Sequence, residues 1–178
     1  MQRGPVRNER GNMNESDIIL RPVGIVKTIA SDNDTRERYS ELESTIEVFP
    51  EFAEALEGID GFSHIFILSY FDRLDVDRIG VLKVRPRRRL KTSEFKVEEL
   101  PLVGVFATPS PYRPNPIGLS LVTLVFRDEN QLVVRGLDCF NGTPILDIKP
   151  YKDRYRADEY EIAAWYHRLP IDEAERLR

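Results

Sequence analysis

The sequence has few cysteines and histidines, and this shortage excludes several kinds of site. Its single cysteine, Cys139, cannot form an intramolecular disulfide and favours a reducing compartment, so we expect a cytoplasmic protein. The two histidines are not spaced as metal ligands are, so we expect that the protein holds no metal ion. A glycine-rich phosphate loop and a dinucleotide fingerprint are also missing, so a nucleotide-like cofactor would not be held in the Rossmann manner.

Long apolar runs are missing as well. No run approaches the roughly 20 residues that a membrane span needs, so we expect no membrane segment. Residues 1–16 are polar and lack the apolar centre of a signal peptide, and we expect them to form a disordered tail. The net charge is −4, so binding of nucleic acid would require a local basic patch.

Prolines are crowded into one stretch, GVFATPSPYRPNPIGLSL at residues 104–121. Proline fixes φ and lacks a backbone donor, which excludes a helix interior or the middle of a sheet. Strand patterns flank the prolines on both sides, so the stretch predicts a stiff loop that carries Arg113 and Asn115. The loop is either a preordered functional platform, which we favour, or a rigid turn that only closes a hairpin.

Short β-branched segments dominate the rest of the chain and predict a mainly β fold. We expect strands at 18–27, 45–49, 62–71, 103–108, 119–127, 131–137 and 145–149, with the apolar segment 62–71 buried on both faces. We also expect a polar loop at 31–44 and helices at 50–56 and 156–169. The hairpin-like connections favour a single small antiparallel β-barrel at 17–155, on which a helical segment at 156–178 packs.

A basic run and an acid–base pair are candidates for a site. The run KVRPRRRLK at 83–91 is either a solvated loop or a surface that contacts RNA phosphates through Arg85, Arg87, Arg88, Arg89 and Lys91. Asp147 and Lys149 share one face of a strand because strand side chains alternate. They form either a surface ion pair or part of the mouth of a site. His64, inside an apolar strand, is more readily explained as a hydrogen-bonded core residue than as a catalyst.

Two proline-containing motifs, RPNPIG at 113–118 and NGTPILDIKPY at 141–151, resemble those of a known family. Together with PVGIVKT at 22–28 and GIDGFSHIFILSYF at 58–71, they are similar to the TsaA-like (TrmO) proteins. These are S-adenosylmethionine-dependent tRNA methyltransferases that act on threonylcarbamoylated adenosine beside the anticodon. The resemblance runs from about residue 21 to 151 and implies a small β-barrel, a homodimer and a cofactor site near the subunit boundary.

The same resemblance implies which residues contact S-adenosylmethionine. By motif position these are Asp72, Arg73, Leu121, Leu137, Asp138, Cys139 and Phe140. The chain departs from the family pattern at Pro109, where many members have arginine, so the cofactor would be held by backbone groups, by Arg113 or by Arg73. Asn141 stands where members often have aspartate, which keeps the turn chemistry and removes a charge.

The resemblance also suggests roles in methyl transfer. Arg113 and Asn115 would orient a carboxylate of the cofactor or of the substrate, because a guanidinium binds a carboxylate in a bidentate manner. Asp147, held by Lys149 and Tyr151, would take the proton that the reacting nitrogen releases. The aromatic residues Tyr112 and Phe140 either stack on an adenine or pack in the core, and the basic run would follow the anticodon-stem phosphates.

Two other classes of function stay open at this point. One is a barrel that binds S-adenosylmethionine or RNA without turnover, as a sensor or adaptor, which Pro109 in place of the arginine keeps possible. The other is a small-molecule enzyme that uses Asp147 and Lys149 and is indifferent to tRNA.

Overall fold

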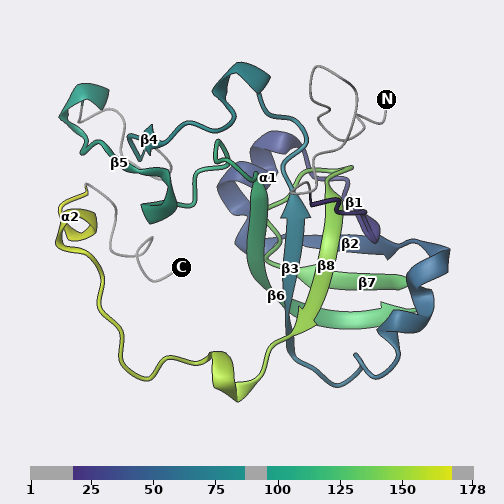
Figure 1. The fold of residues 1–178 in the computed structure, drawn as a ribbon. Helices are drawn as coiled ribbons and strands as arrows, with labels where there is room; N and C mark the ends of the chain where they lie inside the picture. Colours follow the sequence, from purple (N-terminus) through teal and green to yellow (C-terminus); the bar gives the residue numbers. More distant parts are fainter. Residues whose placement is uncertain (1–17, 87–95, 170–178) are drawn as a thin grey trace.

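The computed structural model describes residues 18–86 and 96–169, and its centre is a closed antiparallel β-barrel (Figure 1). Its strands are arranged in the order β1-β2-β7-β6-β3-β8, and β8 pairs with β1 to close the barrel. Their bounds are β1 (Gly24–Lys27), β2 (Glu43–Val48), β3 (His64–Tyr70), β6 (Ile117–Asp128), β7 (Gln131–Arg135) and β8 (Pro144–Pro150). The predicted mainly β fold with an antiparallel barrel is therefore confirmed. Within residues 18–86 and 96–169, none of the helices has the length and hydrophobicity of a membrane-spanning segment.

The core fills the barrel with β-branched and leucine side chains that alternate along each strand. Along β3, Ile65, Ile67 and Ser69 are buried, whereas the intervening residues are partly or largely exposed. The expectation that this segment is buried on both faces is wrong, because an antiparallel barrel covers only the inner face of its strands. The inward-facing side chains that are almost fully buried include Val26, Ile46, Ile65, Ile67, Val122, Leu132, Val134 and Ile145.

An α-helix and a 3₁₀ turn together occupy most of the segment 31–44, where the sequence predicted a polar loop. Helix α1 (Asp32–Arg38) begins at Ser31, whose Oγ accepts a hydrogen bond from the backbone N–H of Asp34 at 3.1 Å. Acidic residues in its first turn and basic residues in its last turn suit the helix dipole. A 3₁₀ turn, η1 (Tyr39–Glu41), leads into β2. The predicted helix at 50–56 is present as a 3₁₀ helix, η2 (Pro50–Leu56).

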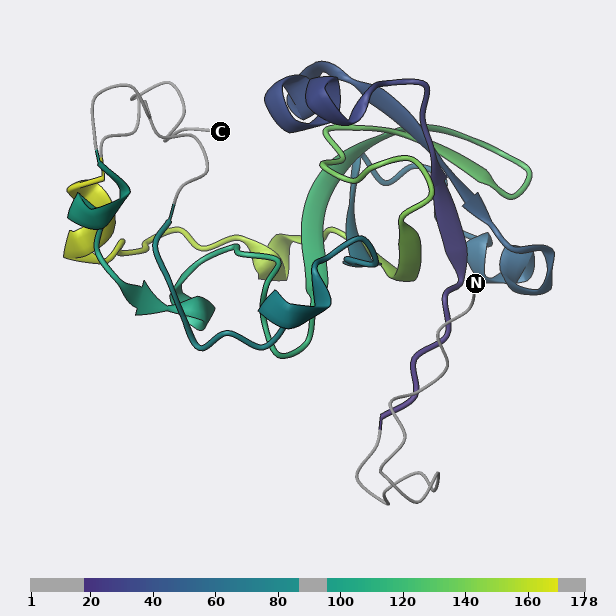
Figure 2. The ribbon, with the colours of Figure 1, turned by 90° about the horizontal axis from the view of Figure 1, so that it is seen from above.

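A long excursion leaves the barrel between β3 and β6. It contains η3 (Val76–Arg78), β4 (Lys83–Val84), η4 (Val97–Glu99), β5 (Val103–Gly104) and η5 (Val105–Ala107), and β4 pairs with β5 in a separate two-stranded sheet. Figure 2 shows this part extending to one side of the barrel. The strand predicted at 103–108 therefore ends after two residues, because the chain enters the turn η5.

Between β8 and residue 169, where the described part of the chain ends, the backbone is mostly extended, and the helix predicted at 156–169 is wrong except at its end. After η6 (Asp153–Tyr155), only α2 (Ala164–His167) is α-helical. Residues 156–163 are exposed and Tyr160 is 75% exposed, so this segment has no packed apolar face to stabilise a helix. Both Figure 1 and Figure 2 show α2 beside the β4–β5 part rather than on the barrel.

Candidate functional site

A cavity of about 460 Å³ lies where the proline-rich loop joins β6. It has the size of a small-ligand site. Three residues named by the sequence line it: Arg113 and Asn115 from the loop, and Asp138 from the segment after β7. Pro109, the departure from the family pattern, also lines it. The structure therefore brings the stiff loop and one of the predicted cofactor residues together.

The loop holds the guanidinium of Arg113 against its own backbone. Nη1 of Arg113 donates to the carbonyls of Thr108 at 3.2 Å and Ser110 at 3.5 Å, the two residues that flank Pro109. The backbone of Arg113 also donates to the carbonyl of Pro111 at 2.9 Å. A positive charge is thus placed beside Pro109 in a largely preordered loop.

Asp138 supplies a carboxylate to the lining of the cavity. Its Oδ1 accepts a hydrogen bond from Ser120 Oγ at 2.7 Å, which links the segment after β7 to β6. The side chains of Leu137 and Cys139 are only 1% and 3% exposed and belong to the core. Neither residue lines the cavity, so their side chains do not face a ligand there.

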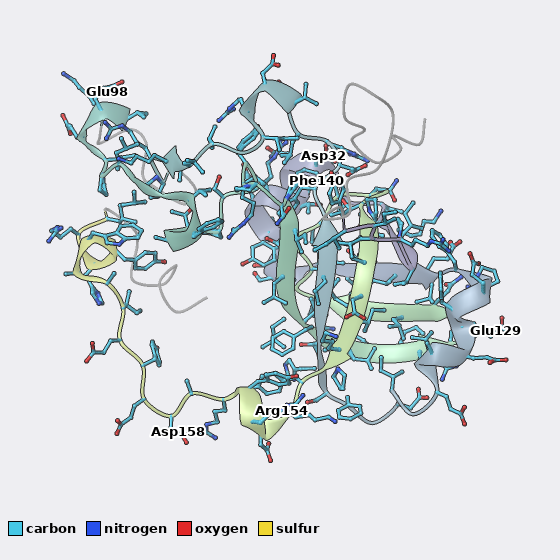
Figure 3. All side chains as sticks on the ribbon, viewed as in Figure 1. Asp32, Glu98, Glu129, Phe140, Arg154 and Asp158 are labelled. Atoms are coloured by element: carbon cyan, nitrogen blue, oxygen red, sulfur yellow. The ribbon has the colours of Figure 1, made fainter. Side chains whose placement is uncertain are left out.

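Arg73 and Phe140 meet in a second cluster with helix α1. The Arg73 guanidinium donates to the carbonyl of Asn141 and lies 3.6 Å from the carboxylate of Asp32. The guanidinium carbons of Arg36 and Arg73 lie 5.0 and 6.0 Å from the centre of the Phe140 ring. Figure 3 shows Asp32 and Phe140 close together at this end of the barrel. Asp72, next to Arg73, is exposed.

Asp147, Lys149 and Tyr151 do not line the cavity. Nζ of Lys149 lies 2.6 Å from the Asp147 carboxylate, and both side chains are about half exposed. The hydrogen bond to Asp147, followed by the charge of that carboxylate, raises the pKa of Lys149 above its ordinary value. The sheet register places the pair beside Leu68 and Phe66 of β3, so it is a surface ion pair on the outside of the barrel. Tyr151 packs nearby, its ring 5.7 Å from that of Phe66.

Other predicted residues lie at varying distances from the cavity. Leu121 is 48% exposed on β6, while its neighbours Leu119 and Ser120 line the cavity. Arg85 donates to the carbonyl of Leu100, which ties the start of the basic run to the η4–β5 segment. The remaining predicted RNA contacts lie outside the described residues: Arg87, Arg88, Arg89 and Lys91.

Sequence reasoning assigned no site role to six other residues that line the cavity: Phe71, Phe106, Ile117, Gly118, Leu119 and Ser120. All six lie within the segments 58–71 and 104–121 that the sequence did single out, so membership of these segments was the available signal. Phe106 was not predicted to line a site because residues 103–108 have a strand pattern, whereas the chain turns at η5. A larger hollow of about 530 Å³, beside Arg21 and Phe52, contains none of the predicted site residues.

Comparison with known proteins supports the resemblance seen in the motifs. The model of the tRNA-methyltransferase O N-terminal domain matches residues 34–157. A "probable S-adenosyl-L-methionine-binding protein" of Methanothermobacter thermautotrophicus is 42% identical over 142 residues, which cover 78% of this chain and 93% of the relative. An S-adenosyl-L-methionine-binding protein of Archaeoglobus fulgidus is 39% identical over 137 residues, covering 75% and 89%.

A solved structure has the same fold. A crystal structure of TrmO matches with a TM-score of 0.61 and 31% identity, over 82% of this chain and 63% of the TrmO chain. The chain therefore spans less than two thirds of that protein. From the domain match, the identity to these relatives and the shared barrel, this chain belongs to the family of the tRNA-methyltransferase O N-terminal domain.

Proposed function

We propose that this protein is an S-adenosylmethionine-dependent tRNA methyltransferase. Its substrate is the threonylcarbamoylated adenosine beside the anticodon, which gains a methyl group on its exocyclic nitrogen. The observation that carries the proposal is the cavity that Arg113 and Asn115, on a stiff loop, line together with Asp138 in a chain of this family. Such a cavity can orient two reactants, and orientation supplies much of the acceleration of a group transfer.

The residues around the cavity fit the charges of the cofactor. S-adenosylmethionine carries a positive sulfur and a carboxylate, and when bound it supplies the methyl group. Asp138 offers a negative charge for the sulfur. Arg113 at the cavity, or Arg73 in the cluster with helix α1, offers a guanidinium for the carboxylate. Asp72 and the backbone of Leu137, Cys139 and Phe140 complete the proposed cofactor contacts, and Leu121 adds apolar surface.

The chain's own residues position the substrate and accept a proton. Methylation of the exocyclic nitrogen would break the bond between the methyl carbon and the cofactor sulfur and would release one proton from that nitrogen. Asp138, which lines the cavity, would take this proton. Arg113 and Asn115 orient the threonyl carboxylate of the substrate. Asp147, paired with Lys149 and near Tyr151, is the alternative proton acceptor, although it lies on the outer face of β8.

We also propose a homodimer that works on tRNA in the cytoplasm. The outer face of the barrel exposes Leu119 and Leu121 by 68% and 48%, with Tyr70 on the neighbouring strand 39% exposed. A second copy covering this face would remove apolar surface from water. The basic run at 83–91 would contact the anticodon-stem phosphates.

A non-catalytic module that binds S-adenosylmethionine or RNA is the second candidate. Pro109, which replaces the arginine found in many family members, favours it, because the chain then has one guanidinium fewer at the cavity. The position of Arg113 against the residues that flank Pro109 favours the enzyme instead, because Arg113 brings a guanidinium to the place where the family arginine is missing.

Nucleoside mass spectrometry separates these candidates. Threonylcarbamoylated tRNA and the same tRNA without that group are incubated with the protein and S-adenosylmethionine. A methyl mass gain on the threonylcarbamoylated nucleoside alone supports the proposed reaction. No mass gain, together with cofactor binding in calorimetry, supports the non-catalytic module.

A further inference from the structure

Three aromatic rings near the site already have one face or edge occupied. The guanidinium carbon of Arg78 lies 3.9 Å above the ring of Tyr112. Phe140 is flanked by the guanidinium groups of Arg36 and Arg73. Phe71 packs against Gly118 so closely that a Cβ at that glycine would lie 2.8 Å from the ring. These rings are poorly placed to receive a planar ligand.

Phe106 differs from them because it is 76% exposed while it lines the cavity. The backbone on either side of Phe106 keeps the ring exposed. The neighbouring Val105 is 2% exposed and Thr108 is 8% exposed, so both ends of the turn are buried. Thr108 donates from its N–H and its Oγ1 to the carbonyl of Val105 at 3.1 and 3.0 Å. A buried, hydrogen-bonded turn therefore holds an apolar ring in solvent. Exposure of an apolar ring to water costs free energy, and packing within the described fold does not explain why the ring is exposed.

The surroundings of Phe106 suit a nucleobase. The guanidinium of Arg113 lies over the ring with its carbon 5.9 Å from the ring centre, so a cation and an aromatic ring that is still largely exposed meet at the cavity. Single-stranded RNA is commonly recognised by bases that stack on such aromatic faces, with cations nearby. The backbone N–H of Val105 donates to the carbonyl of Leu82 at 2.9 Å, which fixes Phe106 beside the start of the basic run. Asp138 and Ser120, by contrast, approach the cavity from the barrel.

We propose that Phe106 is the platform on which the target adenine of the RNA stacks, with Arg113 beside it. This inference rests on the proposed function and adds to it the residue that holds the base. Phe106 is a binding and positioning residue and takes no part in proton transfer. The RNA base is favoured over the adenine of the cofactor because Val105, next to Phe106, is bonded through its backbone N–H to the carbonyl of Leu82, directly before the basic run.

A fluorescent base tests the stack directly. The probe is an anticodon stem-loop RNA with 2-aminopurine at the position of the target adenosine, whose fluorescence falls when the base stacks on an aromatic ring. The parent protein and Phe106→Tyr should quench it. Phe106→Leu and Phe106→Ala should not, and Phe106→Ala should weaken binding of the stem-loop about tenfold, within the range known for one base–aromatic stack. Because the side chain is exposed, these variants should keep the parent's unfolding temperature.

The control is Phe126→Ala, which removes a ring that is 53% exposed on β6 and does not line the cavity. It should quench like the parent. Calorimetry with S-adenosylmethionine and sedimentation complete the test. Loss of cofactor binding with full quenching in Phe106→Ala would assign the ring to the cofactor, and dissociation of a dimer would assign it to an interface. Either result overturns the proposal.

Quenching needs no catalysis, so the two proposals fail separately. Methyl transfer by the parent with unchanged quenching in Phe106→Ala refutes the platform and leaves the proposed function standing. Quenching that depends on Phe106 in a protein without methyl transfer refutes the proposed enzyme and supports a module that binds RNA.

Discussion

The ring of Phe71 occupies the space that a side chain at Gly118 would need. A Cβ at Gly118 would lie 2.8 Å from Cζ of Phe71 and 2.5 Å from Oγ of Ser69. Both distances are too short for atoms in contact, so only glycine permits this packing. Because Gly118 and Phe71 also line the cavity, the start of strand β6 and part of the cavity lining depend on the same contact.

Gly118→Ala should therefore damage both stability and the site. The added methyl group must displace Phe71 or Ser69, and overpacking of this kind costs about 1–3 kcal/mol. Chemical denaturation should show the loss of stability, and calorimetry with S-adenosylmethionine should show weaker binding. Gly104→Ala is the matched control, because its Cβ would have nothing within 4 Å and its φ is −61°. Equal stability of the two variants would contradict the role given to the Phe71 contact.

Arg113→Ala should lower kcat/KM for methyl transfer by about a hundredfold or more while the barrel still folds. The guanidinium is the positive group that the loop holds at the cavity, and removal of a fixed donor to a developing or bound charge has an effect of this size. Arg113→Lys should recover only part of the activity, because an ammonium cannot reproduce the planar bidentate contact. Steady-state kinetics and circular dichroism check the expectation. A variant as active as the parent would exclude the loop from function.

Replacing Arg87, Arg88 and Arg89 together by alanine should weaken tRNA binding and flatten its salt dependence. Each lost phosphate contact should reduce the slope of log K against log salt by about 0.7–0.9. Arg135→Ala is a useful control, since Arg135 pairs with Glu43 at 2.6 Å on the barrel. An unchanged slope in the triple variant would show that the basic run is only a solvated segment.

Asp147→Asn should lower the pKa of Lys149 toward its ordinary value, because the carboxylate is the cause of the upward shift. A raised folded-state pKa means that the pair stabilises the fold below the ordinary lysine pKa, and this contribution is lost as the pH rises through the raised pKa. The effect on stability should be small because the pair is exposed.

An NMR titration of the Lys149 side chain measures the pKa shift, and methyl transfer by the same variant tests Asp147 as the alternative proton acceptor. Full activity in Asp147→Asn with a large loss in Asp138→Asn would leave Asp138 as the acceptor. The reverse result would require the outer face of β8 to form part of the site.

Several elements follow from the sequence because their signals are local. The alternating segments at 119–127, 131–137 and 145–149 correspond to β6, β7 and β8, since a strand with one buried face requires that period. The segment at 156–169 has apolar residues at helical spacing, yet only its last part forms a helix, because an amphipathic helix needs a surface to cover. Helix α1 was missed because its start signal, the cap at Ser31, lies in a polar segment without apolar periodicity.

Backbone chemistry explains why the stiff loop was identified from sequence. Proline restricts the chain wherever it occurs, so Arg113 and Asn115 could be assigned to a preordered segment.

Which side chains share the cavity depends on how distant strands close the barrel. Ser120 and Asp138 are 18 positions apart and meet through a hydrogen bond, whereas Asp147 and Lys149 lie beside β3 outside the cavity. Periodicity places residues on a common face but does not specify the neighbouring strand. Only the tertiary structure decides that neighbour, because strand pairing and barrel closure depend on contacts between distant parts of the chain.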